Sequence, residues 1–177
     1  MWTIATVNMK HLLRPTLGLL LVGLLAPTCV PREEGAQISD FTFGLICSDS
    51  LDSPHVCSKT NDIVVTGNGR CVYDRKVVPC TWYGYEFDYH LPKDSITLAC
   101  RWSSSDRQNI GNPDSIVAEN VRDGTYELVL KGRAGHFINP QYRAPERIAG
   151  ATEVFQVCAS GGKDLFAVTY RLRFPGE

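Results

Sequence analysis

The strongest constraint on the fold is a strict alternation of apolar and polar side chains in several short segments. The clearest segment lies near the C-terminus, where every second residue is apolar: Phe166, Val168, Tyr170, Leu172 and Phe174. Because successive side chains of a β-strand point to opposite faces, this period predicts a strand with one buried face. Beyond residue 28, no segment sustains the 3.6-residue period of an amphipathic helix. The pattern therefore predicts an all-β protein.

Further strands follow from the same alternation and from the turn residues between them. In addition to the C-terminal strand, we expect strands at 41–47, 63–66, 71–73, 77–89, 96–102, 126–130 and 153–158, with a break at Pro79. About seven to nine short strands without intervening helices predict an antiparallel β-sandwich of immunoglobulin-like or similar architecture. A single domain over 41–177 is large enough for one hydrophobic core. Two segments, 103–123 and 132–150, are predicted to be long connecting loops.

Six cysteines of this domain are predicted to form three disulfides: Cys47, Cys57, Cys71, Cys80, Cys100 and Cys158. Spacing favours bonds between Cys47 and Cys57 and between Cys71 and Cys80, which leaves Cys100 for Cys158. Paired cysteines are typical of proteins exported to an oxidising compartment. The separation of the third pair is similar to that of the inter-sheet bridge in immunoglobulin-type sandwiches, but the tryptophan expected after the first cysteine is absent. The sequence therefore predicts an architecture and no particular family.

The N-terminus has the layout of an export signal. Two basic residues, Lys10 and Arg14, precede an uninterrupted apolar run over 17–26. This run is shorter than the roughly 20 apolar residues that a membrane-spanning helix needs. We predict a signal over 1–28, and a start at Met9 would give it the compact form of ordinary bacterial signals.

Cys29 follows the signal directly and is predicted to be a lipid-attachment site. Its position resembles that of the acylated cysteine of bacterial lipoproteins, whose signal is cut just ahead of it. Those signals usually place leucine three residues before the cysteine and a small residue directly before it, whereas Ala26 and Thr28 stand here. The alternative is ordinary cleavage nearby, which would release a soluble exported protein. The polar segment 29–40 is predicted to form a flexible tether.

Charge and composition argue against several classes of function. The 18 basic and 19 acidic residues are interspersed, whereas nucleic-acid binding favours a basic stripe. No CxxC pair occurs and the histidines lie at no familiar ligand spacing, so we predict no metal. Phosphate-binding loops and dinucleotide fingerprints are absent, so we predict no cofactor. Glu86 and Asp88 have the spacing of a glycosidase pair, but carboxylates on an exposed strand are mostly solvated, and we predict no enzymatic activity.

The segment TWYGYEFDYH, Thr81 to His90, divides into two faces. Four aromatic side chains share one face and are predicted to line the core: Tyr83, Tyr85, Phe87 and Tyr89. The opposite face is predicted to be a contact surface with one aromatic anchor: Trp82, Glu86, Asp88 and His90. The segment 132–150 adds further candidates to this surface: Arg133, His136, Arg143 and Arg147.

Together these features predict a non-catalytic exported envelope protein that binds another protein. We expect a lipid-anchored accessory or inhibitor protein in the periplasm, held at the outer membrane, with secretion as the alternative location. The competing prediction is a carbohydrate-binding module that recognises envelope or extracellular polysaccharide. The expected partner is therefore a protein or a polysaccharide, and no nucleic acid.

Overall fold

The computed structural model describes residues 35–48, 53–73, 75–112 and 115–176, except for the side chains of residues 48, 73 and 108–120. Within these ranges it contains strands and turns but no helix. The strands are β1 (Gln37–Ser48), β2 (Pro54–Lys59), β3 (Asp62–Val64), β4 (Gly69–Tyr73), β5 (Lys76–His90), β6 (Ser95–Asn112), β7 (Ser115–Lys131), β8 (Ala134–Arg143), β9 (Gly150–Ser160) and β10 (Lys163–Phe174). All of them belong to one unit, Glu33–Glu177. The predicted signal and most of the predicted tether lie outside the described residues.

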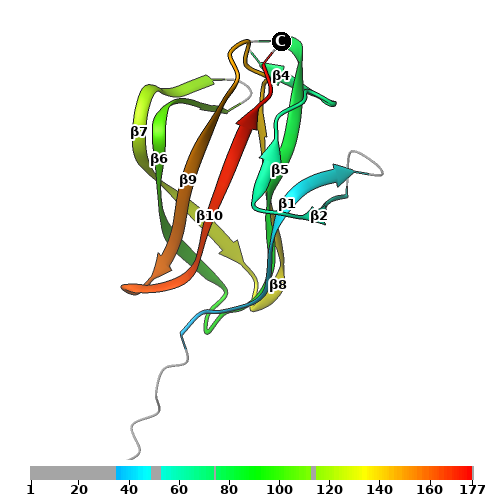
Figure 1. Ribbon diagram of the computed structural model, residues 1–177. Helices are drawn as coiled ribbons and strands as arrows, with labels where there is room; N and C mark the ends of the chain where they lie inside the picture. The colour runs from blue at the N-terminus through cyan, green and yellow to red at the C-terminus, as the bar shows by residue number, and fades with distance from the viewer. Residues whose placement is uncertain (1–34, 49–52, 74, 113–114, 177) are drawn as a thin grey trace, which may run out of the picture. The chain divides into compact units, whose positions relative to one another are not determined.

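The strands form two sheets that pack face to face as a β-sandwich (Figure 1). The first sheet has the order β2–β1–β5–β4, with β8 also paired to β5. The second sheet has the order β3–β10–β9–β6–β7. Neighbouring strands run antiparallel except for β3 and β10, which run parallel. The predicted all-β sandwich is confirmed, with ten strands in the described residues instead of about seven to nine.

The first sheet is built around β5. One edge of β5 pairs with β1 from Tyr83 to His90, and the other edge pairs with β4 up to Cys80 and with β8 from Thr81 onward. The break predicted at Pro79 is wrong, since β5 is continuous there. Pro79 is tolerated because only the β4 edge is paired at that point, and proline is confined to such edge positions.

The aromatic stripe of β5 forms the inner wall of the sandwich, as the alternation predicts. Tyr85 and Phe87 are fully buried, Tyr83 is buried, and Tyr89 is partly buried against the same core. The ring of Phe166, in β10 of the opposite sheet, lies 5.1 Å from that of Tyr85 and 5.3 Å from that of Phe87. Burial of each such ring contributes on the order of 2 kcal/mol. These contacts hold the two sheets together.

The first strand, β1, begins at Gln37, earlier than the predicted start at Phe41. Pairing of β1 with β5 shifts at a β-bulge around Asp40, whose φ is 53°. The extra residue lets both Ile38 and Phe41 pack against the core, which interrupts the alternation in the sequence. Residues 37–40 therefore belong to a strand and not to the predicted tether.

The two long loops predicted at 103–123 and 132–150 are wrong. The first segment is the outer part of β6 and β7, and the second contains β8, which pairs with β5 along its whole length. β6 and β7 are joined by backbone hydrogen bonds, which form regardless of the side chains. The polar outer parts of the two strands therefore pair with each other without an alternation of apolar residues. The glycine and proline of β8 resemble a loop in composition, but such residues are accepted on an edge strand.

The three predicted disulfides are confirmed: Cys47–Cys57, Cys71–Cys80 and Cys100–Cys158. The first two close the β1–β2 and β4–β5 hairpins. The third joins directly paired residues of β6 and β9, whose Cα atoms are 4.1 Å apart. This disulfide therefore lies within one sheet, whereas the immunoglobulin disulfide bridges two sheets. By chain entropy, this bond with its sequence separation of 58 contributes about 4 kcal/mol, and each short one about 3 kcal/mol.

Gly84 lies between Tyr83 and Tyr85 in β5 and is predicted to be irreplaceable. A Cβ atom there would collide with the carbonyl oxygen of Asn139 in β8, and the φ of +157° is one that other residues rarely adopt. We expect Gly84→Ala to lower the free energy of unfolding by about 2–3 kcal/mol, because β5 and β8 must separate locally. Urea denaturation measures this loss. Gly150→Ala is the matched control, since a Cβ atom at Gly150 meets nothing within 4 Å. Equal losses in both variants would contradict the steric explanation.

Candidate contact surface

The outer face of the first sheet carries the candidate residues of β5. Four of its side chains alternate with the buried stripe and lie on this outer face: Trp82, Glu86, Asp88 and His90. The neighbouring strand β8 adds two more, with His136 opposite Asp88 and Tyr142 opposite Trp82. The pairing of β5 with β8 therefore joins candidates that are distant in the sequence.

His136 links the two carboxylates of β5. Its Nδ1 atom lies 2.8 Å from Asp88 Oδ1, and its Nε2 atom lies 3.7 Å from Glu86 Oε2. The side chains of His136 and Asp88 are each 54% exposed, whereas that of Glu86 is 19% exposed. Because exposed ion pairs contribute at most about 1 kcal/mol, this cluster adds little to stability and leaves charged groups accessible to a partner.

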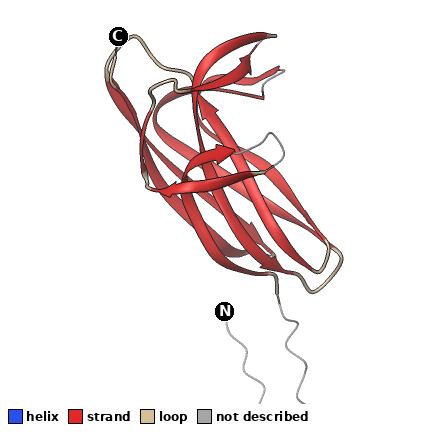
Figure 2. Cartoon of the chain, turned by 90° about the vertical axis from the view of Figure 1, so that its right-hand side faces the viewer, coloured by secondary structure: helices blue, strands red, loops and turns tan. Residues whose placement is uncertain are grey.

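Glu86 also accepts a hydrogen bond from the backbone of β2. Its Oε2 atom accepts a hydrogen bond of 3.0 Å from the backbone N–H of Val56. Figure 2 shows the end of the β1–β2 hairpin crossing in front of the first sheet, which explains how a β2 amide reaches a β5 side chain. The sequence gives no signal for this contact, because its donor is a backbone group that every residue except proline carries.

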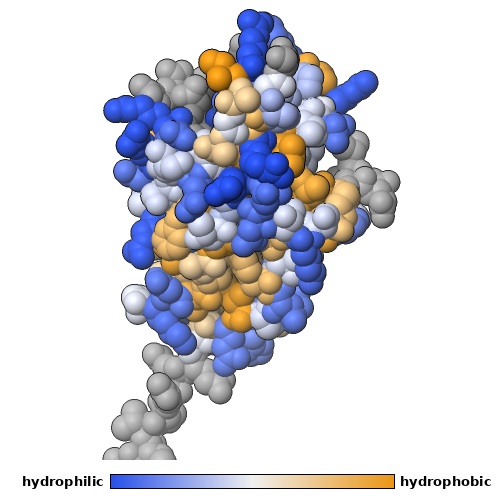
Figure 3. Space-filling view, viewed as in Figure 1, coloured by the Kyte–Doolittle hydropathy of each residue, from blue (hydrophilic) through white to orange (hydrophobic). Residues whose placement is uncertain are grey.

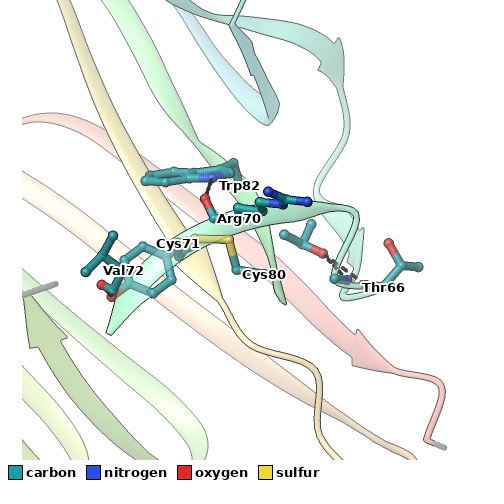
Figure 4. Close-up of a disulfide and its surroundings, with 9 residues drawn as sticks. Thr66, Arg70, Cys71, Val72, Cys80 and Trp82 are labelled. Atoms are coloured by element: carbon teal, nitrogen blue, oxygen red, sulfur yellow. Dashed lines mark hydrogen bonds between the residues drawn. A yellow bond between two sulfur atoms is a disulfide. The ribbon is translucent and has the colours of Figure 1, made fainter. Parts of the chain in front are cut away.

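Trp82 and Tyr142 form an aromatic pair whose polar atoms are anchored to β4. Their ring centroids lie 5.2 Å apart with the planes tilted by 58°. The indole N–H of Trp82 donates to the Arg70 carbonyl at 3.2 Å, and the Tyr142 hydroxyl donates to the Val72 carbonyl at 3.3 Å. Figure 4 shows the indole beside Arg70 and the disulfide of the β4–β5 hairpin. The pairing of Tyr142 with Trp82 was not predicted from the sequence, because it depends on the register of β5 and β8 and not on a local pattern.

The three predicted arginines lie away from the outer face. Arg133 is in the turn before β8, where its Nε atom lies 3.0 Å from Asp94 Oδ1. Arg143 is at the end of β8 and pairs with Glu146 at 2.7 Å. Arg147 is exposed in the connection between β8 and β9. The structure thus groups Trp82 and the His136 cluster on one face and places the arginines at the ends of the sandwich.

The chemistry of the outer face fits recognition. In the described part of the chain, no group of three or more His, Cys, Asp or Glu side chains is arranged to hold a metal ion. Both ring nitrogens of His136 lie against carboxylates. An aromatic pair beside accessible charged groups is typical of a surface that contacts another macromolecule.

A shallow depression of about 570 Å³ lies between β1 and β10, away from the outer face. Its lining mixes apolar and polar residues: Phe41, Thr42, Phe43, Lys59, Thr60, Asn61, Ala167, Val168 and Thr169. Lys59 is the single charged residue in that lining.

Inside the sandwich, a string of polar side chains links the two sheets. Gln156 donates through Nε2 to the Tyr126 hydroxyl at 2.5 Å, and this hydroxyl lies 3.3 Å from that of Tyr85. Burial raises the pKa of Tyr85 far above its ordinary value, and Tyr126 adds to the rise. Burial also raises the pKa of Tyr170. These phenols are therefore neutral hydrogen-bonding groups of the core.

No protein-family model matches the chain, and no curated protein matches it by sequence. The class of protein that the structure defines is a disulfide-bonded β-sandwich with a polar and aromatic outer face.

No helix in the described ranges has the length and apolar character to cross a membrane.

The buried tyrosines predict how stability depends on alkaline pH. A phenol with a raised pKa in the folded state keeps its proton at a pH where the same phenol in the unfolded chain has lost it. Its contribution to the free energy of unfolding is therefore complete below about pH 10 and is lost as the pH rises above 10. For Tyr85 we expect a loss of about 1.4 kcal/mol for each pH unit above 10. Urea denaturation at a series of pH values measures this slope. Tyr85→Phe should make the slope shallower by the same amount, and an unchanged slope would rule out this assignment.

Proposed function

We propose that this protein is a non-catalytic exported envelope protein that binds another protein, either as an accessory subunit or as an inhibitor. The observation that carries the proposal is the anchored aromatic pair on the outer face. Because hydrogen bonds to β4 hold Trp82 and Tyr142, both rings lose little conformational entropy when a partner covers them. The partly exposed Asp88 carboxylate and His136 ring supply polar groups further along the same face.

The proposed location follows from the disulfides and the N-terminal sequence. Three disulfides are compatible with an exported protein in an oxidising compartment. We propose that the segment 1–28 directs export and that Cys29 carries a lipid. This anchor would hold the sandwich in the periplasm at the outer membrane, and secretion without a lipid is the alternative.

A carbohydrate-binding module is the second candidate, and the outer face favours it less. Sugar rings stack on an open, flat aromatic surface. Here the Trp82 ring packs against Tyr142 at a 58° tilt, and its N–H is already hydrogen-bonded to Arg70. Quenching of tryptophan fluorescence by peptidoglycan fragments, lost in Trp82→Phe, would favour the carbohydrate function over protein binding.

The proposal predicts one dominant protein partner. We expect chemical crosslinking in the producing cells, followed by mass spectrometry, to return one envelope or secreted protein. Asp88→Lys should reduce this adduct by roughly tenfold or more, because a contact residue on the outer face reverses its charge. Thr97→Lys is the matched control at an exposed position of β6, on the other sheet. Recovery of abundant bystanders alone, or equal loss in both variants, would refute the proposal.

The lipid anchor is tested separately. Because acylation requires the Cys29 thiol, Cys29→Ser should abolish incorporation of labelled palmitate and release the protein from the membrane fraction. Metabolic labelling and membrane fractionation measure both effects, and Cys47→Ser/Cys57→Ser is a control that removes cysteines elsewhere. Palmitate incorporation that is unchanged in Cys29→Ser would show that Cys29 is not the attachment site.

A further inference from the structure

One end of the sandwich exposes an unusual amount of aliphatic surface. It consists of residues 70–73 and 75–78 of the β4–β5 hairpin together with 144–148 of the β8–β9 connection, and we call it the hairpin end. Val77 is 68% exposed, Val72 is 46% exposed, and Ile148 is 81% exposed. The two valines are directly paired across the hairpin. Figure 3 shows apolar groups beside hydrophilic ones at the upper end of the view, where Figure 1 places β4.

The charges at the hairpin end have one prevailing sign. Four basic residues are exposed there: Arg70, Arg75, Lys76 and Arg147. Within the described part of the hairpin end, the acidic residue is Glu146, and its carboxylate is engaged by Arg143 at 2.7 Å. The sequence adds Asp74 between β4 and β5, so four basic residues stand against two acidic ones. The surface therefore combines aliphatic side chains with a basic rim.

The hairpin end is also held rigidly in place. The Cys71–Cys80 disulfide closes the hairpin, and the Trp82 and Tyr142 side chains donate hydrogen bonds to β4 carbonyls. At its base, Thr81 Oγ1 accepts hydrogen bonds from two successive backbone N–H groups, at 2.9 and 3.1 Å. A contact surface that is ordered in advance loses less entropy when it binds.

The hairpin end lies far from the start of β1. β5 begins in the hairpin at Lys76 and ends at His90, which pairs with Gln37 at the start of β1. At about 3.3 Å per residue, the length of β5 separates the hairpin from the chain entry by roughly 45 Å. The hairpin end therefore lies at the opposite end of β5 from Gln37, where β1 begins.

We propose that the hairpin end binds an acidic protein surface, with Val72 and Val77 at the apolar centre of the contact and Arg75 and Lys76 facing carboxylates at its rim. This inference rests on the proposed function and adds a second contact region, separate from the outer face, together with the charge of the partner surface that meets it. An apolar centre surrounded by complementary charges is the usual anatomy of a protein interface. The basic rim steers the acidic partner toward the contact.

The test places a photoreactive amino acid at one of three positions of the full chain in the producing cells. The positions are Val77 at the hairpin end, Asp88 on the outer face and Thr97 on the other sheet. We expect a discrete protein adduct at Val77 and none at Thr97. Arg75→Glu/Lys76→Glu should reduce the Val77 adduct by roughly tenfold or more, because the rim then repels an acidic partner.

The matched control reverses two charges at the other end of the molecule. Lys93→Glu/Lys131→Glu changes the net charge equally at exposed positions near the end of β5 and should leave the Val77 adduct intact. Val72→Ser/Val77→Ser, with the photoreactive residue moved to Lys76, tests the apolar centre and should also reduce the adduct. Thermal unfolding of each variant should match that of the parent chain, because these side chains are exposed.

Each other outcome would overturn the inference in a recognisable way. An adduct at Asp88 alone would reject the hairpin end but preserve the proposed function, whereas no adduct at any position would reject both. A Val77 adduct that is unaffected by Arg75→Glu/Lys76→Glu would reject the acidic partner. Cosedimentation of the purified protein with phosphatidylglycerol vesicles, lost in the same variant, would assign the hairpin end to an anionic lipid surface instead of a protein.

Discussion

The packing of the β5 aromatic stripe against β10 is the interaction on which the rest of the structure depends. Tyr85 and Phe87 are completely buried against Phe166 of the other sheet. Because side chains alternate along a strand, burying these residues forces Trp82 and Asp88 to the opposite side. The core and the outer face are therefore two consequences of one strand, and a change in its register would lose both.

The disulfides and the Trp82–Tyr142 pair stabilise contacts between neighbouring strands and not the packing of one sheet on the other. Two of the three disulfides close single hairpins, and the third joins neighbouring strands of one sheet. The two sheets are thus held to each other by side-chain packing and by the hydrogen bond between the Tyr85 and Tyr126 hydroxyls. Trp82 and Tyr142 connect the outer face to β4, so both proposed contact regions share one rigid support.

The predictions from sequence succeeded where the signal is local. The apolar alternation in β10 and in the stripe of β5 reports burial of one face, and the short spacing of two cysteine pairs reports hairpins. They failed where a strand is held mainly by backbone pairing with its neighbour and carries no apolar alternation. The outer part of β6 and β7 and the edge strand β8 are held by backbone hydrogen bonds, which do not require an apolar pattern. The start of β1 was missed for a different reason, because the bulge at Asp40 interrupts the alternation of apolar and polar residues.

The sequence by itself determined the all-β class, the inner face of β5 and two of the cysteine pairs, because alternation, ring burial and short spacing are properties of short segments. Cys100 and Cys158 were then assigned to each other by elimination. Only the tertiary structure decided that His136 and Tyr142 join the outer face, that the Cys100–Cys158 bond lies within one sheet, and that the hairpin end lies opposite the chain entry. The physical reason is that these relations depend on which strands pair and in what register. Register is set by the collective packing of both sheets, which no single segment of the sequence encodes.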